Sequence, residues 1–174
     1  DTKSSTTQTK YLSSSMYFDG TGDYIETDDV SLPGDFTVEY WVYNGTNGNN
    51  YFFCIGDTYN ASGIETYIGS SGAAFILYSN QGTRITSGSK PTVNDWSHVT
   101  IVRSGSTVTL YLNGTSLGTW SSSTTFSGAV RLGAEYYNGS VTGTLTGYLS
   151  DVRITKDLAR YTSAFTPPTA ALQG

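Results

Sequence analysis

Charged residues are scarce in this sequence: Asp, Glu, Lys and Arg make up 13% of its 174 residues, and the formal net charge is −5. The nine Lys and Arg are scattered rather than grouped. A nucleic-acid-binding surface needs a basic stripe that neutralises phosphates, so nucleic acid is excluded as a partner. Apolar runs all fall well short of the roughly 20 residues of a membrane-spanning helix. We therefore expect no membrane insertion, and the N-terminus lacks a signal-peptide pattern.

Cysteine and histidine are also nearly absent. Cys54 is the only cysteine, so an internal disulfide is impossible, and His98 is the only histidine. Without a Cys/His cluster there is no zinc site. A Ser-His-Asp triad would have to use His98, but this residue sits within a strand pattern beside Trp96. We therefore predict a packed, structural role for His98.

Aromatic residues are plentiful. The hydrophobic fraction is only 37%, yet the aromatic fraction is 14%, with 14 Tyr and 7 Phe. Such large side chains can form a sizeable core without many leucines. Disordered chains have few aromatic residues and high charge, so we predict that most of this chain is folded.

The alternation of short strand-like runs with turn residues predicts one all-β domain. Asp1 to Ser14 is rich in Ser, Thr and Lys, which indicates a flexible tail or linker, and the domain is expected from Ser15 to Gly174. Short β-branched and aromatic runs alternate with Gly, Asn, Asp and Ser, as in sandwiches and barrels. About a dozen strands are too many for one open sheet, so we predict two packed antiparallel sheets. The expected strands are Ser15–Phe18, Tyr24–Glu26, Phe36–Tyr43, Tyr51–Ile55, Gly63–Ile68, Ala73–Tyr78, Arg84–Thr86, Ser97–Ser104, Thr107–Leu112, Ser116–Ser121, Val130–Leu132 and Thr144–Thr155.

One hairpin is specified by its turn. Asn113-Gly114 favours a two-residue turn with positive φ after the alternating strand Thr107–Leu112. A regular register would place Leu112 opposite Thr115, Leu110 opposite Leu117 and Thr107 opposite Trp120. Trp120 would then point away from the core. It is either covered by another layer or available as a platform on which a sugar stacks.

Four segments stand out along the sequence: Met16–Tyr24, Asp35–Val42, Trp96–Arg103 leading into Leu110–Gly114, and Gly147–Ile154. They resemble segments of laminin-G-like, concanavalin-A-like domains and follow one another in the order in which that family has them. The resemblance covers about Ser15 to Pro168 and implies a jelly-roll sandwich whose members bind glycans or proteins, frequently with calcium. The ending, Ala159 to Pro168, is similar to that of such domains in bacteriophage structural proteins.

An acidic cluster near the first turn is a candidate calcium site, because calcium takes six to eight oxygen ligands. In related sandwiches the first and last strands lie side by side, and the resemblance implies Asp19 and Asp151 as ligands of a structural ion. The alternative is that these residues form Asx-turns beside glycine. The cluster comprises Asp19, Asp23, Glu26, Asp28 and Asp29.

Catalysis is not expected. Glucanases share this sandwich and need two carboxylates across the scissile bond. Glu26 and Asp28 lie two residues apart, but no second Glu completes the motif, and Glu39 stands alone on its strand face. We therefore predict a non-enzymatic module.

A sugar site needs an aromatic platform beside polar donors. Loop segments with this composition are Tyr51, then Asp57 with Tyr59 and Asn60, and then Tyr136, Tyr137 and Asn138. We expect these residues, with Trp120, to bind a host-surface glycan from the surface of a phage virion. Any oligomerisation is expected to come from assembly of the parent virion. The alternatives are contact with another virion protein in a purely structural domain, an adhesion module of a secreted bacterial protein, and a polysaccharide-degrading enzyme.

Overall fold

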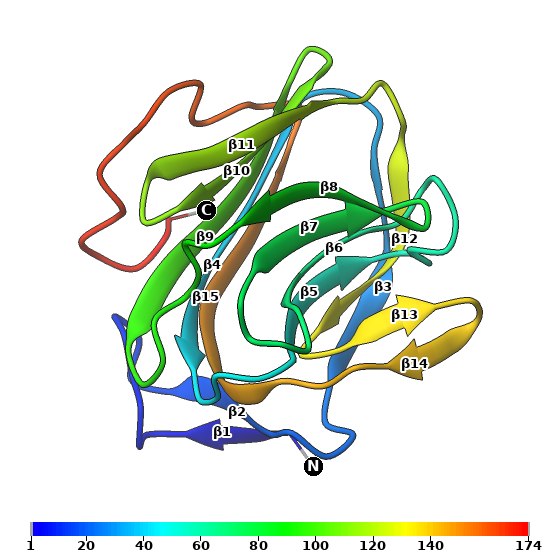
Figure 1. Ribbon diagram of the computed structural model, residues 1–174. Coiled ribbons are helices and arrows are strands. Elements are labelled where there is room, and N and C mark those ends of the chain that lie inside the picture. Colours follow the sequence, from blue (N-terminus) through cyan, green and yellow to red (C-terminus); the bar gives the residue numbers. More distant parts are fainter. Residues whose placement is uncertain (1, 174) are drawn as a thin grey trace.

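The computed structural model describes residues 2–173, and strands are its only regular secondary structure (Figure 1). The predicted tail begins at Asp1 and the predicted domain ends at Gly174, and these two residues lie outside the described residues. Between them, no helix is long and apolar enough to cross a membrane. The strands are β1 (Lys3–Ser5), β2 (Ser15–Asp19), β3 (Ile25–Leu32), β4 (Phe36–Asn44), β5 (Asn50–Ile55), β6 (Ile64–Ile68), β7 (Phe75–Ser79), β8 (Gly82–Ser87), β9 (Trp96–Ser104), β10 (Thr107–Leu112), β11 (Thr115–Ser121), β12 (Phe126–Leu132), β13 (Glu135–Tyr137), β14 (Ser140–Thr142) and β15 (Thr146–Lys156).

The strands form two packed antiparallel sheets, as predicted. The seven-stranded sheet has the order β1-β2-β15-β4-β9-β10-β11, and the six-stranded sheet has the order β3-β12-β5-β6-β7-β8. A separate two-stranded hairpin, β13–β14, projects beside β5 and β12 (Figure 1). The first long strand, β2, and the last strand, β15, are neighbours in one sheet. This is the jelly-roll sandwich that the sequence predicted.

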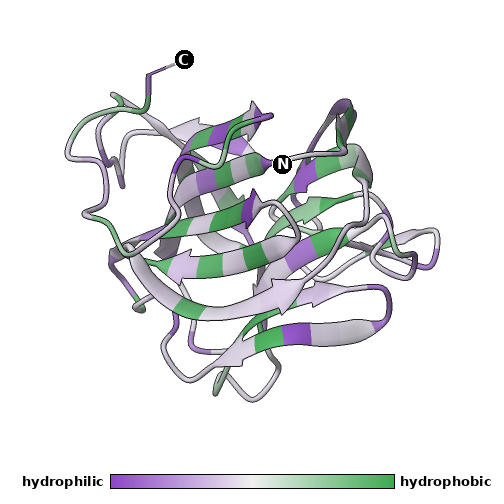
Figure 2. Ribbon diagram, turned by 90° about the horizontal axis from the view of Figure 1, so that it is seen from above, coloured by the Kyte–Doolittle hydropathy of each residue, from purple (hydrophilic) through white to green (hydrophobic). Residues whose placement is uncertain are grey.

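Side-chain alternation along each strand builds the core. Successive residues of a strand point to opposite faces, so Phe36, Val38, Tyr40 and Val42 of β4 all project into the space between the sheets. Bands of hydrophobic and polar residues alternate along the strands in Figure 2. The opposite face of β4 is also covered, because Glu39 has no exposed surface. Both faces of this central strand are therefore buried.

The predicted N-terminal tail is wrong in part. Lys3–Ser5 form strand β1, which pairs with β2 and places Lys3 opposite Tyr17. Further along, the Lys10 ammonium lies 4.2 Å from the centroid of the Trp41 ring. Backbone hydrogen bonds to a sheet edge do not depend on apolar side chains. A Ser-rich and Thr-rich composition therefore did not indicate this strand.

The predicted register of the β10–β11 hairpin is wrong beyond its turn. Leu112 pairs with Thr115 as expected, but a β-bulge follows, and Leu110 pairs with Gly118 instead of Leu117. The extra residue in β11 moves each later side chain of that strand to the opposite face of the sheet from the one predicted. Trp120 consequently pairs with Val108, which is buried in the core, and its ring lies 6.0 Å from that of Phe126.

Candidate functional site

The face of the six-stranded sheet that points away from the core carries tyrosines and acids. Cross-strand partners project to the same side of a sheet. One row runs Arg131, Cys54, Glu65 and Tyr78 across β12, β5, β6 and β7. The next row runs Tyr51, Tyr67 and Ile76. We call the tyrosine face the group made of these sheet tyrosines and those of the adjoining loop and hairpin: Tyr51, Tyr59, Tyr67, Tyr78, Tyr136 and Tyr137.

The β13–β14 hairpin is fixed to this face through its backbone. The Thr58 N–H donates to the Tyr136 carbonyl at 3.0 Å, and the Tyr51 N–H donates to the Thr144 carbonyl at 3.1 Å. The hairpin backbone also approaches the Tyr51 ring closely. A Cβ atom on Gly143 would lie 2.4 Å from Cδ2 of Tyr51, so only glycine fits there.

Asp57 holds the tip of the hairpin. Its Oδ1 accepts hydrogen bonds from the N–H groups of Tyr59 at 3.0 Å and Asn138 at 2.9 Å. Its Oδ2 accepts the N–H of Gly139 at 3.0 Å. Both carboxylate oxygens are thus engaged by backbone donors from two segments far apart in the sequence. Asp57, which we predicted to contact a ligand, positions the aromatic residues around it.

The tyrosine rings form two groups. Tyr51 stacks on Tyr67 with centroids 4.8 Å apart, and Tyr67 meets Tyr78 edge to face at 6.2 Å. Tyr59 and Tyr137 meet edge to face at 5.4 Å, and Tyr59 is 38% exposed. Rigid, partly exposed aromatic rings offer apolar faces to a ligand at little cost in conformational entropy.

A pair of carboxyl groups lies under the hairpin. Glu65 of β6 is 1% exposed. Burial and, as a smaller contribution, the adjacent charge of Glu135 together raise its pKa to about 9. Glu135 of β13 accepts a hydrogen bond from the Thr142 hydroxyl at 2.7 Å. At neutral pH Glu65 is therefore protonated.

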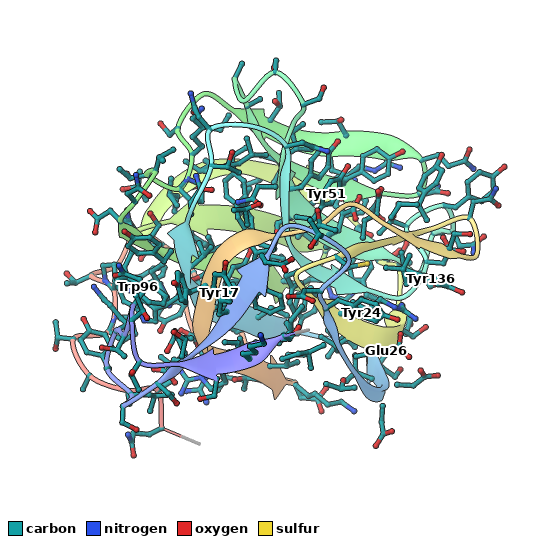
Figure 3. The ribbon with its side chains drawn as sticks, turned by 90° about the horizontal axis from the view of Figure 1, so that it is seen from below. Tyr17, Tyr24, Glu26, Tyr51, Trp96 and Tyr136 are labelled. Carbon is teal, nitrogen blue, oxygen red and sulfur yellow. The ribbon has the colours of Figure 1, made fainter. Side chains whose placement is uncertain are left out.

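Arg131 and Tyr136 form the other side of the face. The Arg131 guanidinium lies 2.7 Å from Glu26 Oε2, and its Cζ lies 3.8 Å from the centroid of the Tyr136 ring. Figure 3 shows Tyr136, Tyr24 and Glu26 on one side of the molecule and Trp96 on the other. The cation is thus enclosed between an acid and an aromatic ring.

Most residues that we predicted to bind a ligand come together here. Tyr51, Tyr59, Tyr136, Tyr137 and Asn138 all belong to this face or its hairpin. The Asn60 N–H donates to the Asp57 carbonyl in the same loop. Trp120 is the exception. Its ring packs against Phe126 and beneath the Arg84 guanidinium, away from the tyrosine face.

The sequence analysis did not identify the residues of this face that lie within β6 and β7. Tyr67 and Tyr78 stand in strands that were predicted correctly, and Glu65 alternates with core residues on β6. Period-two alternation indicates that these side chains share a face. It does not say whether that face meets solvent or a covering hairpin, which is why they were missed.

The predicted calcium site is not assembled as proposed. Asp19 pairs with Thr146 across β2 and β15, whereas Asp151 lies further along β15. Five residues of strand separate the two positions by about 16 Å, which excludes one ion held by both carboxylates. Asp19 Oδ1 instead accepts hydrogen bonds from the N–H of Thr21 at 2.8 Å and from its hydroxyl at 2.6 Å, as a turn residue does. Asp151 Oδ2 accepts the Leu172 N–H at 2.7 Å. Among residues 2–173, no group of three or more His, Cys, Asp or Glu side chains is arranged to hold a metal ion.

His98 is buried, as predicted. Its Nε2 lies 3.3 Å from Glu39 Oε2, on the outer face of the seven-stranded sheet, beneath the C-terminal segment. Glu39 also pairs with Arg153, whose Nη2 lies 2.7 Å from Oε1. Burial alone would raise the pKa of Glu39, but hydrogen bonds from His98 and Arg153 hold it below its usual value. This cluster joins the sheet to the segment that covers it.

The two antiparallel sheets and their jelly-roll connections define a lectin-type β-sandwich. The chain belongs to the concanavalin A-like lectin/glucanases superfamily, whose model matches residues 19–160. A search of curated protein sequences gives no significant match.

Solved structures with similar folds come from different kinds of protein. Domain 4 of the extracellular arabinanase AbnA from Geobacillus stearothermophilus, in complex with arabinotriose, is 14% identical with a TM-score of 0.68, covering 88% of this chain and 74% of that one. A SAP-like pentraxin of Limulus polyphemus is 19% identical with a TM-score of 0.61, covering 79% and 73%. The enzymatically active domain of tailspike protein 2 of bacteriophage CBA120 is 12% identical with a TM-score of 0.63, covering 88% of this chain but only 27% of that one. At these identities the similarity establishes the fold.

Proposed function

We propose that this domain is a non-catalytic glycan-binding module and that the tyrosine face is its binding surface. The observation that carries the proposal is the pair Tyr59 and Tyr137, whose rings meet at 5.4 Å and are held in place by Asp57. Sugar rings have apolar faces and polar edges, and an aromatic pair flanked by backbone and Asn donors suits both. The arabinotriose complex of a similarly folded domain supports the same class of ligand.

The acids of the molecule support a non-catalytic role. A glycosidase needs two carboxyl groups facing the substrate at a separation of about 5–9 Å. Glu65 is buried beneath a hairpin, Glu39 is buried against Arg153, and Glu26 is paired with Arg131. Each of these carboxyl groups is either paired with an arginine or buried where a polysaccharide does not reach it. Reducing-end release from laminarin, agarose or alginate, lost in Glu26→Gln or Glu39→Gln, would overturn this part of the proposal.

We further propose that the parent protein is a structural component of a bacteriophage virion that displays the domain to host-surface glycans. The C-terminal sequence from Ala159 to Pro168 and the similarly folded tailspike domain support this setting. An antibody against the domain should label intact virions of a phage that carries it. Labelling confined to lysates of infected cells would contradict the proposal.

Single substitutions test the binding surface. Tyr59→Ala and Tyr137→Ala should each weaken binding to a glycan array about fivefold to tenfold, because each removes about 1 kcal/mol or more of stacking. Their stabilities should stay within about 1 kcal/mol of the parent, since both rings are partly exposed. Tyr11 is 37% exposed, close to the value for Tyr59, but packs on Trp41 of the other sheet. Tyr11→Ala is thus the matched control and should bind normally. Unaltered binding by both test variants would place the site elsewhere.

A further inference from the structure

The charges around the tyrosine face are mostly negative. The Asp57 side chain lies at the hairpin tip, and Glu135 lies on β13 of the same hairpin, beside the buried Glu65. Glu26 lies at the edge of the same sheet, where its charge is offset by that of Arg131. These groups come from separate strands and loops, and the fold brings them to one surface.

The cation in contact with this face is not available to a ligand. Arg131 is 7% exposed, its Nη2 lies 2.7 Å from Glu26, and the Tyr136 ring covers its guanidinium. An incoming carboxylate or sulfate would have to displace Glu26 and move Tyr136 before it could pair with Arg131. Arg131 therefore does not offset the carboxyl groups of Asp57 and Glu135 that an anionic ligand would approach at this face.

We propose that the tyrosine face selects uncharged glycans and rejects carboxylated and sulfated ones. This inference rests on the proposed glycan-binding function and adds its specificity. Like charges placed close together across an interface oppose binding strongly. For an acidic sugar within a few ångströms of Asp57 or Glu135, the penalty at low ionic strength should reduce affinity about tenfold or more relative to its neutral counterpart. Added salt should reduce the difference in affinity between the acidic and the neutral sugar, because it screens exposed charges.

The test compares matched probes on the intact domain. A glycan array is read at low salt with neutral members and their carboxylated or sulfated counterparts, including lactose with sialyllactose and dextran with dextran sulfate. Each set is measured with calcium and with a chelator, because a divalent cation at these carboxylates would reverse the sign of the local charge. We expect the neutral member to bind about tenfold or more tightly in both conditions. Equal or tighter binding of the acidic member, in either condition, would overturn the inference.

Charge-neutralising variants localise the effect. Glu135→Gln should leave binding of the neutral member within about twofold and strengthen that of the acidic member severalfold. Asp157→Asn removes the same charge from an exposed position at the end of β15, with φ of 59°, a conformation that Asn tolerates. This control should leave the preference unchanged. If the two variants behave alike, the local charge of the tyrosine face is not what selects the ligand.

The outcomes separate the two proposals. If acidic glycans bind well and Tyr59→Ala abolishes their binding, the site is correct and the specificity is wrong. If no glycan of either class binds, the proposed function fails, and the specificity fails with it.

Discussion

Glu65 is a carboxyl group that the fold withdraws from water and places beside a second carboxyl group. Its pKa is raised to about 9, against an ordinary value near 4.3 for an unfolded chain. Between these two pH values the native state retains a proton that the unfolded state releases. The free energy of unfolding therefore falls as pH rises through this window, and the stabilisation is complete only below the lower value. The neighbouring thiol and phenol groups lose their protons above this pH window, because burial raises their pKa values too. These groups are Cys54, Tyr51, Tyr67 and Tyr78, and the pKa of Tyr78 is raised to about 12.

We predict that Glu65→Gln removes this pH dependence. Glutamine can donate a hydrogen bond toward Glu135 as protonated Glu65 does, but it has no proton to lose. Relative to the parent, the variant should gain stability by about 1 kcal/mol per pH unit between pH 5 and pH 8. Urea unfolding at three pH values measures this, with Asp157→Asn as the control. A stability difference that is the same at every pH would show that Glu65 is ionised throughout.

At the scale of elements, one side chain, that of Asp57, holds the tip of the β13–β14 hairpin, whereas backbone hydrogen bonds hold its base. Asp57 supplies both of its carboxylate oxygens to three backbone N–H groups, two of them at the hairpin tip. The strands of the hairpin are only three residues long, and β14 is exposed throughout. Such a short hairpin is marginal without outside contacts. We therefore expect the tip of the hairpin to become more mobile when the hydrogen bonds to Asp57 are lost.

We predict that Asp57→Ala loosens the hairpin without unfolding the sandwich. The amides of Asn138 and Gly139 should exchange with solvent at least tenfold faster, while those of β4 and β9 stay protected. Glycan binding should fall with hairpin order, because Tyr137 loses its fixed position. Asp57→Asn keeps one acceptor oxygen and should be intermediate. Unchanged exchange at the tip in Asp57→Ala would mean that the backbone contacts of Thr58 and Tyr51 suffice.

At the scale of the whole molecule, the two sheets are covered differently on their outer faces. The six-stranded sheet is partly covered by the hairpin, whereas the C-terminal segment crosses the seven-stranded sheet beside β9–β11 (Figure 1). Phe165 anchors that segment: its ring stacks on Tyr161 at 3.7 Å and meets Tyr111 at 5.4 Å. Its N–H also donates to the Gly114 carbonyl at 3.0 Å. The segment thus shields Glu39 and His98 from solvent and leaves the tyrosine face free.

We predict that Phe165→Ala destabilises the whole domain by about 2 kcal/mol, because it removes aromatic contacts over a buried polar cluster. For a domain of this size the melting midpoint should fall by about 4–8 °C. Ser163→Ala, at an exposed position of the same segment, should leave it within about 1 °C. Glycan binding at the tyrosine face should be unaffected below the transition. A parent-like midpoint for Phe165→Ala would mean that the segment covers the sheet without stabilising it.

What the sequence determined by itself was most of the strands, without β1, β13 and β14, and the turn of the β10–β11 hairpin. Each predicted strand overlaps an observed one, and the turn at Asn113-Gly114 pairs Leu112 with Thr115 as expected. These features are local: alternation with a period of two residues, β-branched and aromatic content, and turn residues that accept positive φ. The family resemblance then supplied the jelly-roll architecture, with the first and last strands of the domain side by side.

Tertiary structure alone decided which outer-face residues could meet a ligand. One bulged residue in β11 turned Trp120 toward the core, and the register of β2 with β15 kept Asp19 and Asp151 apart. The contacts of Asp57 with Asn138, and of Tyr51 with Gly143, join segments more than 80 residues apart. Local patterns carry no information about such contacts, because they depend on how a short hairpin folds back over a distant sheet.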